Sequence, residues 1–233
     1  MPKLKPIETA TLQERAYASL RIALMSGVYA PGDSITLRGV AQDLGTSQMP
    51  VREAVKRLVS ERALEMPNSR LVRVPVATQE RLKEICNVRI KLESYAAELA
   101  AESISEEDLK RIEKLNQKVK TQNARGNVKG VLARNRELHA AIYRIGGNRL
   151  LCGLIEDLWV LVGPYFNLAS NGKQNKSYPF DLEKHEELLL ALSNGDGTKA
   201  SAIIQADIQQ TFEMYSEFVA EMVTPGDVVT ATS

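Results

Sequence analysis

The feature that most constrains the fold of this chain is a change in its hydrophobic pattern near residue 77. Up to that point, short helical stretches are followed by "PNSRLVRVPV", a turn and then alternating valine and arginine, a pattern typical of a small β-hairpin. From Thr78 onward, apolar residues recur at the spacing of long amphipathic helices, and strand-like alternation is absent. We therefore predict a mainly α protein with two domains, residues 1–76 and 77–233, joined near "VPVAT".

The first domain is predicted to contain three helices ahead of the hairpin. One should span about 11–26, and a short second helix should begin at Thr36 and end at Gly45, since glycine favours the left-handed position after a helix. We expect the hydroxyl of Ser47 to cap a third helix. Pro50 is then its third residue, where a proline costs no hydrogen bond. Three helices, a tight turn and a hairpin predict a winged helix-turn-helix, whose third helix enters a DNA major groove.

The third helix has two distinct faces. Its apolar face is predicted to be buried and consists of Val51, Val55, Leu58 and Val59. Its opposite face carries polar residues spaced four apart, which are Gln48, Arg52 and Lys56. The first 76 residues carry 11 Lys and Arg against 7 Asp and Glu, a net of +4, whereas the rest carry 19 against 22. This asymmetry favours a nucleic-acid-binding module; the alternative, a solvated charged helix, explains the cations but not the proline and hairpin beside them.

The second domain is predicted to be an all-α bundle of six or seven helices. Two of them should run from Thr78 to about residue 102 and from Ser105 to about residue 124, the latter with a capping box completed by Asp108. Further helix starts are expected at Asn127, Asn148, Asp181 and Thr198. Pro164 should kink or end the apolar run "LLCGLIEDLWVLVGPYF".

Composition indicates a cytoplasmic protein. No uninterrupted apolar run approaches the roughly 18 residues of a membrane span, and the first residues lack the apolar stretch of a secretory signal. Cys86 and Cys152 lie far apart without metal-ligand spacing, which is typical of reduced thiols in a cytosolic protein. We therefore expect neither a disulfide nor association with a membrane.

The segment "LRGVAQDLGTSQMPVREAVKRLVSERAL" resembles the DNA-binding region of GntR-type bacterial transcription regulators. The residues that fit its signature are Ser47, Pro50, Val51, Arg52, Glu53, Ala54 and Leu58. The segments "VRIKLESYAAELAA", "NRELHAAIYRIGGNRLL" and "HEELLLALSNGDGTKA" resemble the FCD-type helical effector domain of the FadR subfamily. The resemblance covers roughly residues 11 to 220, with the two parts in the expected order.

The resemblance implies a homodimeric transcription regulator, and not an enzyme, that binds an inverted repeat in double-stranded DNA. We expect a repressor whose helical domain binds a small organic acid. The residues implied to contact DNA are Arg38, Ser47, Gln48, Met49, Arg52 and Lys56, with Asn68, Arg70 and Arg73 of the wing. Gln48 stands where arginine is common, and glutamine pairs best with adenine. The wing tip lacks the usual glycine, which disfavours a minor-groove approach by the wing backbone, but Arg70 and Arg73 can still meet phosphates.

The resemblance also implies a ligand site in the helical domain. Asn135 and His139 lie four residues apart and share a helix face. Together with His185 and Asp207, they occupy the positions at which many relatives hold a divalent metal, and this donor set suits Zn, Ni or Mn. Arg89, at the position of a family arginine, is expected to contact the carboxylate of the effector.

Other interpretations of these residues stay open. The pocket could be metal-free and use the same residues as hydrogen-bond partners, and Arg89 could form a simple ion pair with Glu93. The four implied metal ligands could instead belong to a helical-bundle metalloprotein or metalloenzyme, although we find no positioned base or nucleophile beyond them. A DNA-binding protein without an effector is a third class, which a large helical domain with polar residues in its interior disfavours.

Overall fold

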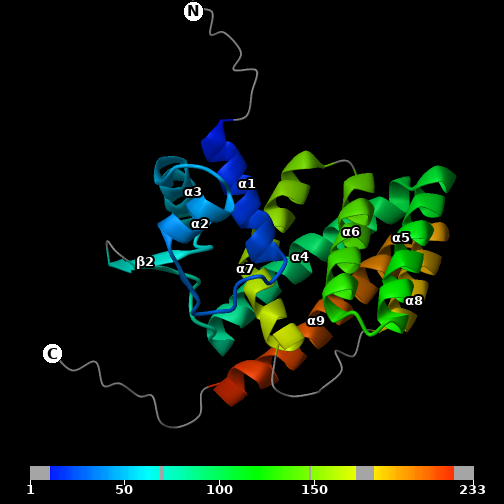
Figure 1. The fold of residues 1–233 in the computed structure, drawn as a ribbon. Helices are drawn as coiled ribbons and strands as arrows, with labels where there is room; N and C mark the ends of the chain where they lie inside the picture. The colour runs from blue at the N-terminus through cyan, green and yellow to red at the C-terminus, as the bar shows by residue number, and fades with distance from the viewer. Residues whose placement is uncertain (1–10, 69–70, 147, 172–180, 223–233) are drawn as a thin grey trace, which may run out of the picture.

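The computed structural model describes residues 11–68, 71–146, 148–171 and 181–222, and over these residues the protein is mainly helical (Figure 1). In the N-terminal part, the elements in chain order are α1 (Leu12–Met25), β1 (Ser34–Ile35), α2 (Leu37–Asp43), α3 (Gln48–Ser60), β2 (Glu65–Asn68) and β3 (Leu71–Arg73). The strands form an antiparallel sheet in the order β1-β3-β2. The predicted winged helix-turn-helix is confirmed, with one strand more than expected.

The additional strand and the helix boundaries of this part have local causes. Strand β1 has two residues, too few for an alternating pattern; they end the segment "GVYAPGDSI" and pair with β3. The side chain of Thr36 caps α2 by accepting a hydrogen bond from the backbone of Gly39. Gly45 follows α2 with a φ of 62°, the left-handed conformation expected there.

The C-terminal part is an all-α bundle of six helices over the residues described. They are α4 (Gln79–Ser103), α5 (Glu106–Ala124), α6 (Val128–Ile145), α7 (Arg149–Asn171), α8 (Leu182–Ser193) and α9 (Gly197–Met222). The expected caps at Thr78, Ser105, Asn127 and Asp181 are present, and Ser105 and Asp108 form the predicted capping box. Asn148 likewise accepts a hydrogen bond from the backbone of Leu151 at the start of α7.

Two predictions in this part are corrected. Helix α9 begins before Thr198, because the carboxylate of Asp196 accepts a hydrogen bond from the backbone of Lys199 and takes the capping role. Of the two outcomes predicted at Pro164, a kink or an end, the end is wrong, because α7 continues to Asn171. At Gly163, a Cβ atom would lie 2.3 Å from the carbonyl oxygen of Leu24, so the glycine lets α1 approach the backbone of α7 closely.

Helix α7 belongs to both hydrophobic cores. Val160 is buried among the residues of the N-terminal core, whereas Trp159, Val162 and Tyr165 are buried in the core of the bundle. Figure 1 shows α7 lying between α1 and the remaining bundle helices. By length and composition, Arg149–Leu168 could cross a membrane. Packing in the two cores accounts for part of its apolar character, whereas Leu150 and Leu154 of the same span are exposed.

Candidate functional site

Helix α3 has the buried and exposed faces that its pattern predicts. The buried residues are Val51, Ala54, Val55 and Leu58. Val59 is only partly buried, and Gln48, Arg52 and Lys56 are exposed on the opposite face. Lys56 pairs with Glu53 at 2.8 Å, whereas no carboxylate of the described residues pairs with Arg52. The helix therefore presents an exposed cation that is available to a partner.

The start of α3 departs from expectation in one respect. Ser47 occupies the N-cap position, but its side chain makes no capping hydrogen bond. A capping hydroxyl accepts from the second or third helical N–H, and the third residue here is Pro50, which has no N–H. Ser47 thus stays exposed beside Met49, a residue that is 63% exposed, and Arg38 of α2 is also exposed.

The wing residues have different surroundings. Arg73 lies opposite Glu65 in the sheet, and its Nε pairs with that carboxylate at 2.5 Å. The side chain of Asn68 accepts a hydrogen bond from the backbone of Leu71 at 3.0 Å. Arg70 lies outside the described residues. The charge of Arg73 is therefore shared with Glu65, unlike that of Arg52.

A cavity in the bundle gathers most of the predicted ligand-binding residues. It is lined by side chains from α4, α6, α7 and α9, which are Arg89, Glu93, Leu132, Asn135, Arg136, His139, Trp159, Phe166, Asp207 and Thr211. Its volume is about 50 Å³, enough for a few water molecules or a small polar group. His185 is not among the lining residues.

Glu93 organises the polar side of this cavity. Its carboxylate is almost fully buried and pairs with the Nε of Arg89 at 2.7 Å. Tyr143 and the indole Nε1 of Trp159 also donate to it, each at 3.1 Å. Burial opposes the charge of Arg89, but the Glu93 carboxylate outweighs that effect and raises the pKa of Arg89. The ion pair between Arg89 and Glu93, which the sequence left open as the alternative to an effector contact, is thus present, and it neutralises the arginine.

Three buried polar atoms around the cavity have no hydrogen-bond partner among the described residues. They are Nη1 of Arg89, Oδ1 of Asn135 and Nε2 of His139. A buried polar atom without a partner costs about 1–3 kcal/mol, so such atoms are usually satisfied by water or a ligand. Their convergence on one small cavity indicates a place where a polar molecule binds.

The two histidines lie close together in a neutral form. Their ring centroids are 5.7 Å apart, and each Nδ1 is near another side chain: Tyr143 at 3.0 Å for His139, and Asn116 at 2.9 Å for His185. Burial lowers the pKa of both imidazoles to about 4. Burial also raises the pKa of Asp207. Within the part of the chain that the structure describes, no three His, Cys, Asp or Glu side chains converge as metal ligands.

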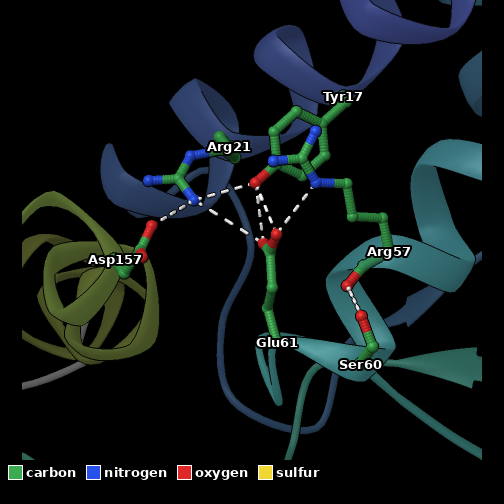
Figure 2. A network of polar contacts seen from close by, with 6 residues as sticks. All are labelled: Tyr17, Arg21, Arg57, Ser60, Glu61 and Asp157. Atoms are coloured by element: carbon green, nitrogen blue, oxygen red, sulfur yellow. Dashed lines mark hydrogen bonds and ion pairs between the residues drawn. The ribbon is translucent and has the colours of Figure 1, made fainter. Parts of the chain in front are cut away.

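A polar network joins α1, α3 and α7 at the junction of the two parts (Figure 2). The hydroxyl of Tyr17 donates to the carboxylate of Glu61, whose Oε1 lies 2.7 Å away, and accepts from Arg21 at 3.0 Å. Arg21 also pairs with Asp157 of α7 at 2.7 Å. Arg57 pairs with Glu61 at 3.0 Å and lies over the ring of Tyr17, 3.8 Å from its centre. The last turn of α3 is thereby connected to α7 through two side chains of α1.

Comparison with known proteins identifies the family. The model of "Bacterial regulatory proteins, gntR family" matches residues 12–74, and that of the "FCD domain" matches residues 84–210. The chain is 30% identical over 223 residues to the HTH-type transcriptional regulator McbR of Escherichia coli (strain K12), which covers 93% of this chain and 100% of that protein. The chain belongs to the GntR family and carries an FCD domain.

Solved structures agree with this assignment. The structure of E. coli McbR/YncC superposes with a TM-score of 0.84 at 29% identity, covering 90% of this chain and 99% of that one. A GntR regulator from Rhodococcus sp. RHA1 shares the fold, with a TM-score of 0.70 at 20% identity over 87% of this chain and 96% of its own. These relatives are transcription regulators and not enzymes. The protein is accordingly a GntR-family transcription regulator with an effector-binding FCD domain.

The bundle cavity, which we call the FCD cavity, is lined by two residues whose importance the sequence did not reveal, Trp159 and Arg136, and a third such residue, Tyr143, contacts its polar side through Glu93. Trp159 and Tyr143 are held by Glu93, which was expected only as a partner of Arg89. Arg136 lines the cavity next to Asn135. The sequence gives one sign of its role, since Arg136 directly follows Asn135, an expected ligand. Successive residues of a helix normally point in different directions, however, so this sign predicts no shared cavity.

Proposed function

We propose that this regulator is a cytoplasmic repressor that binds an inverted-repeat operator as a homodimer and releases it when a small carboxylic acid occupies the FCD cavity. Residues 1–76 are the DNA-binding domain in this proposal, and residues 77–233 are the effector-binding and dimerisation domain. The observation that carries it is the set of unpartnered buried atoms on Arg89, Asn135 and His139 around one cavity. A carboxylate offers an acceptor to the guanidinium, and a hydroxyl or bound water offers a donor to the amide oxygen.

On the DNA side, we propose that α3 lies in the major groove. The contacts are assigned to Arg38, Ser47, Gln48, Met49, Arg52 and Lys56, with Asn68, Arg70 and Arg73 at the wing. Exposure of the α3 face and the lack of an ion pair at Arg52 support this assignment. Gln48 favours adenine. A homodimer places two such helices about one DNA turn, ~34 Å, apart, which fits an inverted repeat.

The DNA-binding half is tested with the duplex found upstream of the protein's own coding region. We expect the protein to bind it more tightly than a scrambled duplex of equal length, with an affinity that falls steeply as salt rises. Equal binding of both duplexes in a gel-shift titration would overturn this half of the proposal.

The effector half is tested by the double variant His139→Ala, His185→Ala. It should still bind operator DNA, because both histidines lie far along the chain from α3, in the bundle. It should no longer respond to those short carboxylic acids that release the wild-type protein. A double variant that responds normally would show that the cavity is not the switch.

A divalent metal (Zn, Ni or Mn) is a second candidate for the same cavity. It is favoured by two atoms of the implied ligand set, Oδ1 of Asn135 and Nε2 of His139, which are buried without partners beside Asp207. Neutral imidazoles suit a metal. His185 and Asp207 would have to move closer to complete the site, since no three such ligands converge within the described residues. Elemental analysis of protein purified without chelators or affinity metal decides between the candidates.

A further inference from the structure

Arg136 of α6 lines two neighbouring spaces that share part of their lining. One is the FCD cavity, where it lies beside Asn135. The other is an outer groove whose lining also includes Met25 of α1, Arg144 of α6 and Trp159 of α7. Since Arg136 and Trp159 line both spaces, they stand between the groove and the cavity. A molecule that reaches the cavity from this groove passes the guanidinium of Arg136.

The charge of Arg136 is not neutralised by a carboxylate of the described residues. Its neighbour Glu137 pairs instead with Arg134 at 2.6 Å. Arg89, the other cation of the cavity, is held by Glu93. Burial lowers the pKa of Arg136, with a small opposing effect of Glu137, yet an arginine stays charged at neutral pH. Arg136 is therefore the lining cation with charge left for an incoming anion.

Arg136 also holds the end of α1. Its Nη1 donates to the backbone carbonyl of Met25 at 3.1 Å and contacts the hydroxyl of Ser26 at 3.2 Å. Close by, Asn167 of α7 donates to the carbonyl of Gly27 at 2.7 Å. Helix α1 packs along α3, so the position of its C-terminal end affects the placement of the recognition helix.

We propose that Arg136 senses the effector. When a carboxylate binds in the cavity, the Arg136 guanidinium pairs with it and gives up its hydrogen bond to the Met25 carbonyl, which loosens the end of α1. This inference rests on the proposed function, because it assumes an anionic effector in the FCD cavity. The exchange is favourable because a guanidinium and a carboxylate can form two parallel hydrogen bonds and also attract each other as opposite charges, whereas the Met25 carbonyl is a neutral acceptor that takes one hydrogen bond. A ligand shifts a conformational equilibrium only if it binds one state more tightly than the other. Here the carboxylate binds more tightly to the state in which Arg136 has left the Met25 carbonyl, because the guanidinium is then free to pair with it.

The test compares Arg136→Gln with Arg144→Gln. Arg144 lines the same groove but is paired with Glu156 at 2.7 Å; it does not line the cavity, and among the described residues it makes no hydrogen bond to α1. Cavity occupancy is followed through the fluorescence of Trp159, the chain's single tryptophan. Acetate and succinate are the probes, and neutral succinamide is their control. DNA affinity is measured by anisotropy on a duplex selected with the wild-type protein.

Without ligand, we expect Arg136→Gln to bind this duplex at least about fivefold more weakly than wild type, which is the lower end of ordinary allosteric couplings. We expect Arg144→Gln to bind within about twofold of wild type. The carboxylate that weakens DNA binding by wild type and by Arg144→Gln should have no further effect on Arg136→Gln. Arg136→Lys, which keeps the charge but lacks the planar fork, should show a reduced response. Far-UV circular dichroism verifies that each variant is folded, and Arg136→Lys replaces Arg136→Gln if the latter is not.

Each contrary result has a distinct meaning. If ligand-free Arg136→Gln binds DNA as wild type does, the inference is wrong. If a carboxylate weakens DNA binding by Arg136→Gln as strongly as by wild type, the inference is wrong but the proposed effector response stands. If no carboxylate changes the Trp159 fluorescence or DNA affinity of the wild-type protein, the proposed effector class is wrong, and the sensing role of Arg136 is wrong with it.

Discussion

The exposed face of α3 and the FCD cavity contain similar ion pairs in opposite surroundings. Lys56 and Glu53 pair at 2.8 Å with side chains 60% and 39% exposed, whereas Arg89 and Glu93 pair at 2.7 Å with side chains 10% and 2% exposed. An exposed pair contributes little, because water and salt replace either partner, whereas a buried charge depends on its partner. The nitrogen–oxygen distance of an ion pair is therefore a poor guide to its contribution to stability in this protein. Because they are exposed, the cations of α3 are available to DNA. Because it is buried, the Arg89–Glu93 pair holds the side chains of the cavity in place.

The largest expected effect comes from breaking the buried pair. Glu93→Gln keeps the shape of the side chain but leaves the charge of Arg89 buried without a counter-charge. We expect a loss of about 3–5 kcal/mol in the free energy of unfolding, measured by urea titration. The matched control is Glu53→Gln, which breaks the exposed pair and should cost less than about 1 kcal/mol. Similar losses for both variants would contradict the comparison.

The second prediction concerns the available charge on α3. Arg52→Ala should weaken binding to the upstream duplex by about 1–3 kcal/mol, because it removes a contact to a base or phosphate. Stability should hardly change, since the side chain is exposed. Lys110→Ala removes a cation of α5 that is also exposed, and it serves as the control. The role of Arg52 is refuted if a gel-shift titration gives both variants the affinity of wild type.

What could be predicted from the sequence was mostly local. Thr78, Ser105 and Asp181 were recognised as caps because a cap acts on residues two or three positions away. The buried stripe of α3 was found because helical spacing is fixed. Even the missing cap bond of Ser47 has a local cause, the absent N–H of Pro50, although it was not anticipated.

What could not be predicted depends on contacts between distant segments. Continuation of α7 through Pro164 goes with its close packing at Gly163 against α1, over a hundred residues earlier. The hydrogen bond from Trp159 to Glu93 joins residues 66 positions apart, and that from Arg136 to Met25 joins residues 111 positions apart. Hydrophobic spacing contains no information on such pairs, so the sequence located the cavity but not the organisation of its charges.

The smallest effect is expected at the junction network, where Tyr17→Phe removes a neutral hydroxyl (Figure 2). Glu61 keeps its ion pair with Arg57 at 3.0 Å, and Arg21 keeps Asp157 at 2.7 Å, so no charge loses all its partners. The ring that lies under the Arg57 guanidinium is also retained. We therefore expect a loss of about 0.5–1.5 kcal/mol in urea titration, the usual contribution of one hydrogen bond. Tyr17→Leu, which also removes the ring, should cost about 0.5–1 kcal/mol more. If Tyr17→Phe loses as much stability as Glu93→Gln, the hydroxyl is essential to the network. Partial burial would then be enough to make the charges of Arg21, Glu61 and Arg57 depend on one another.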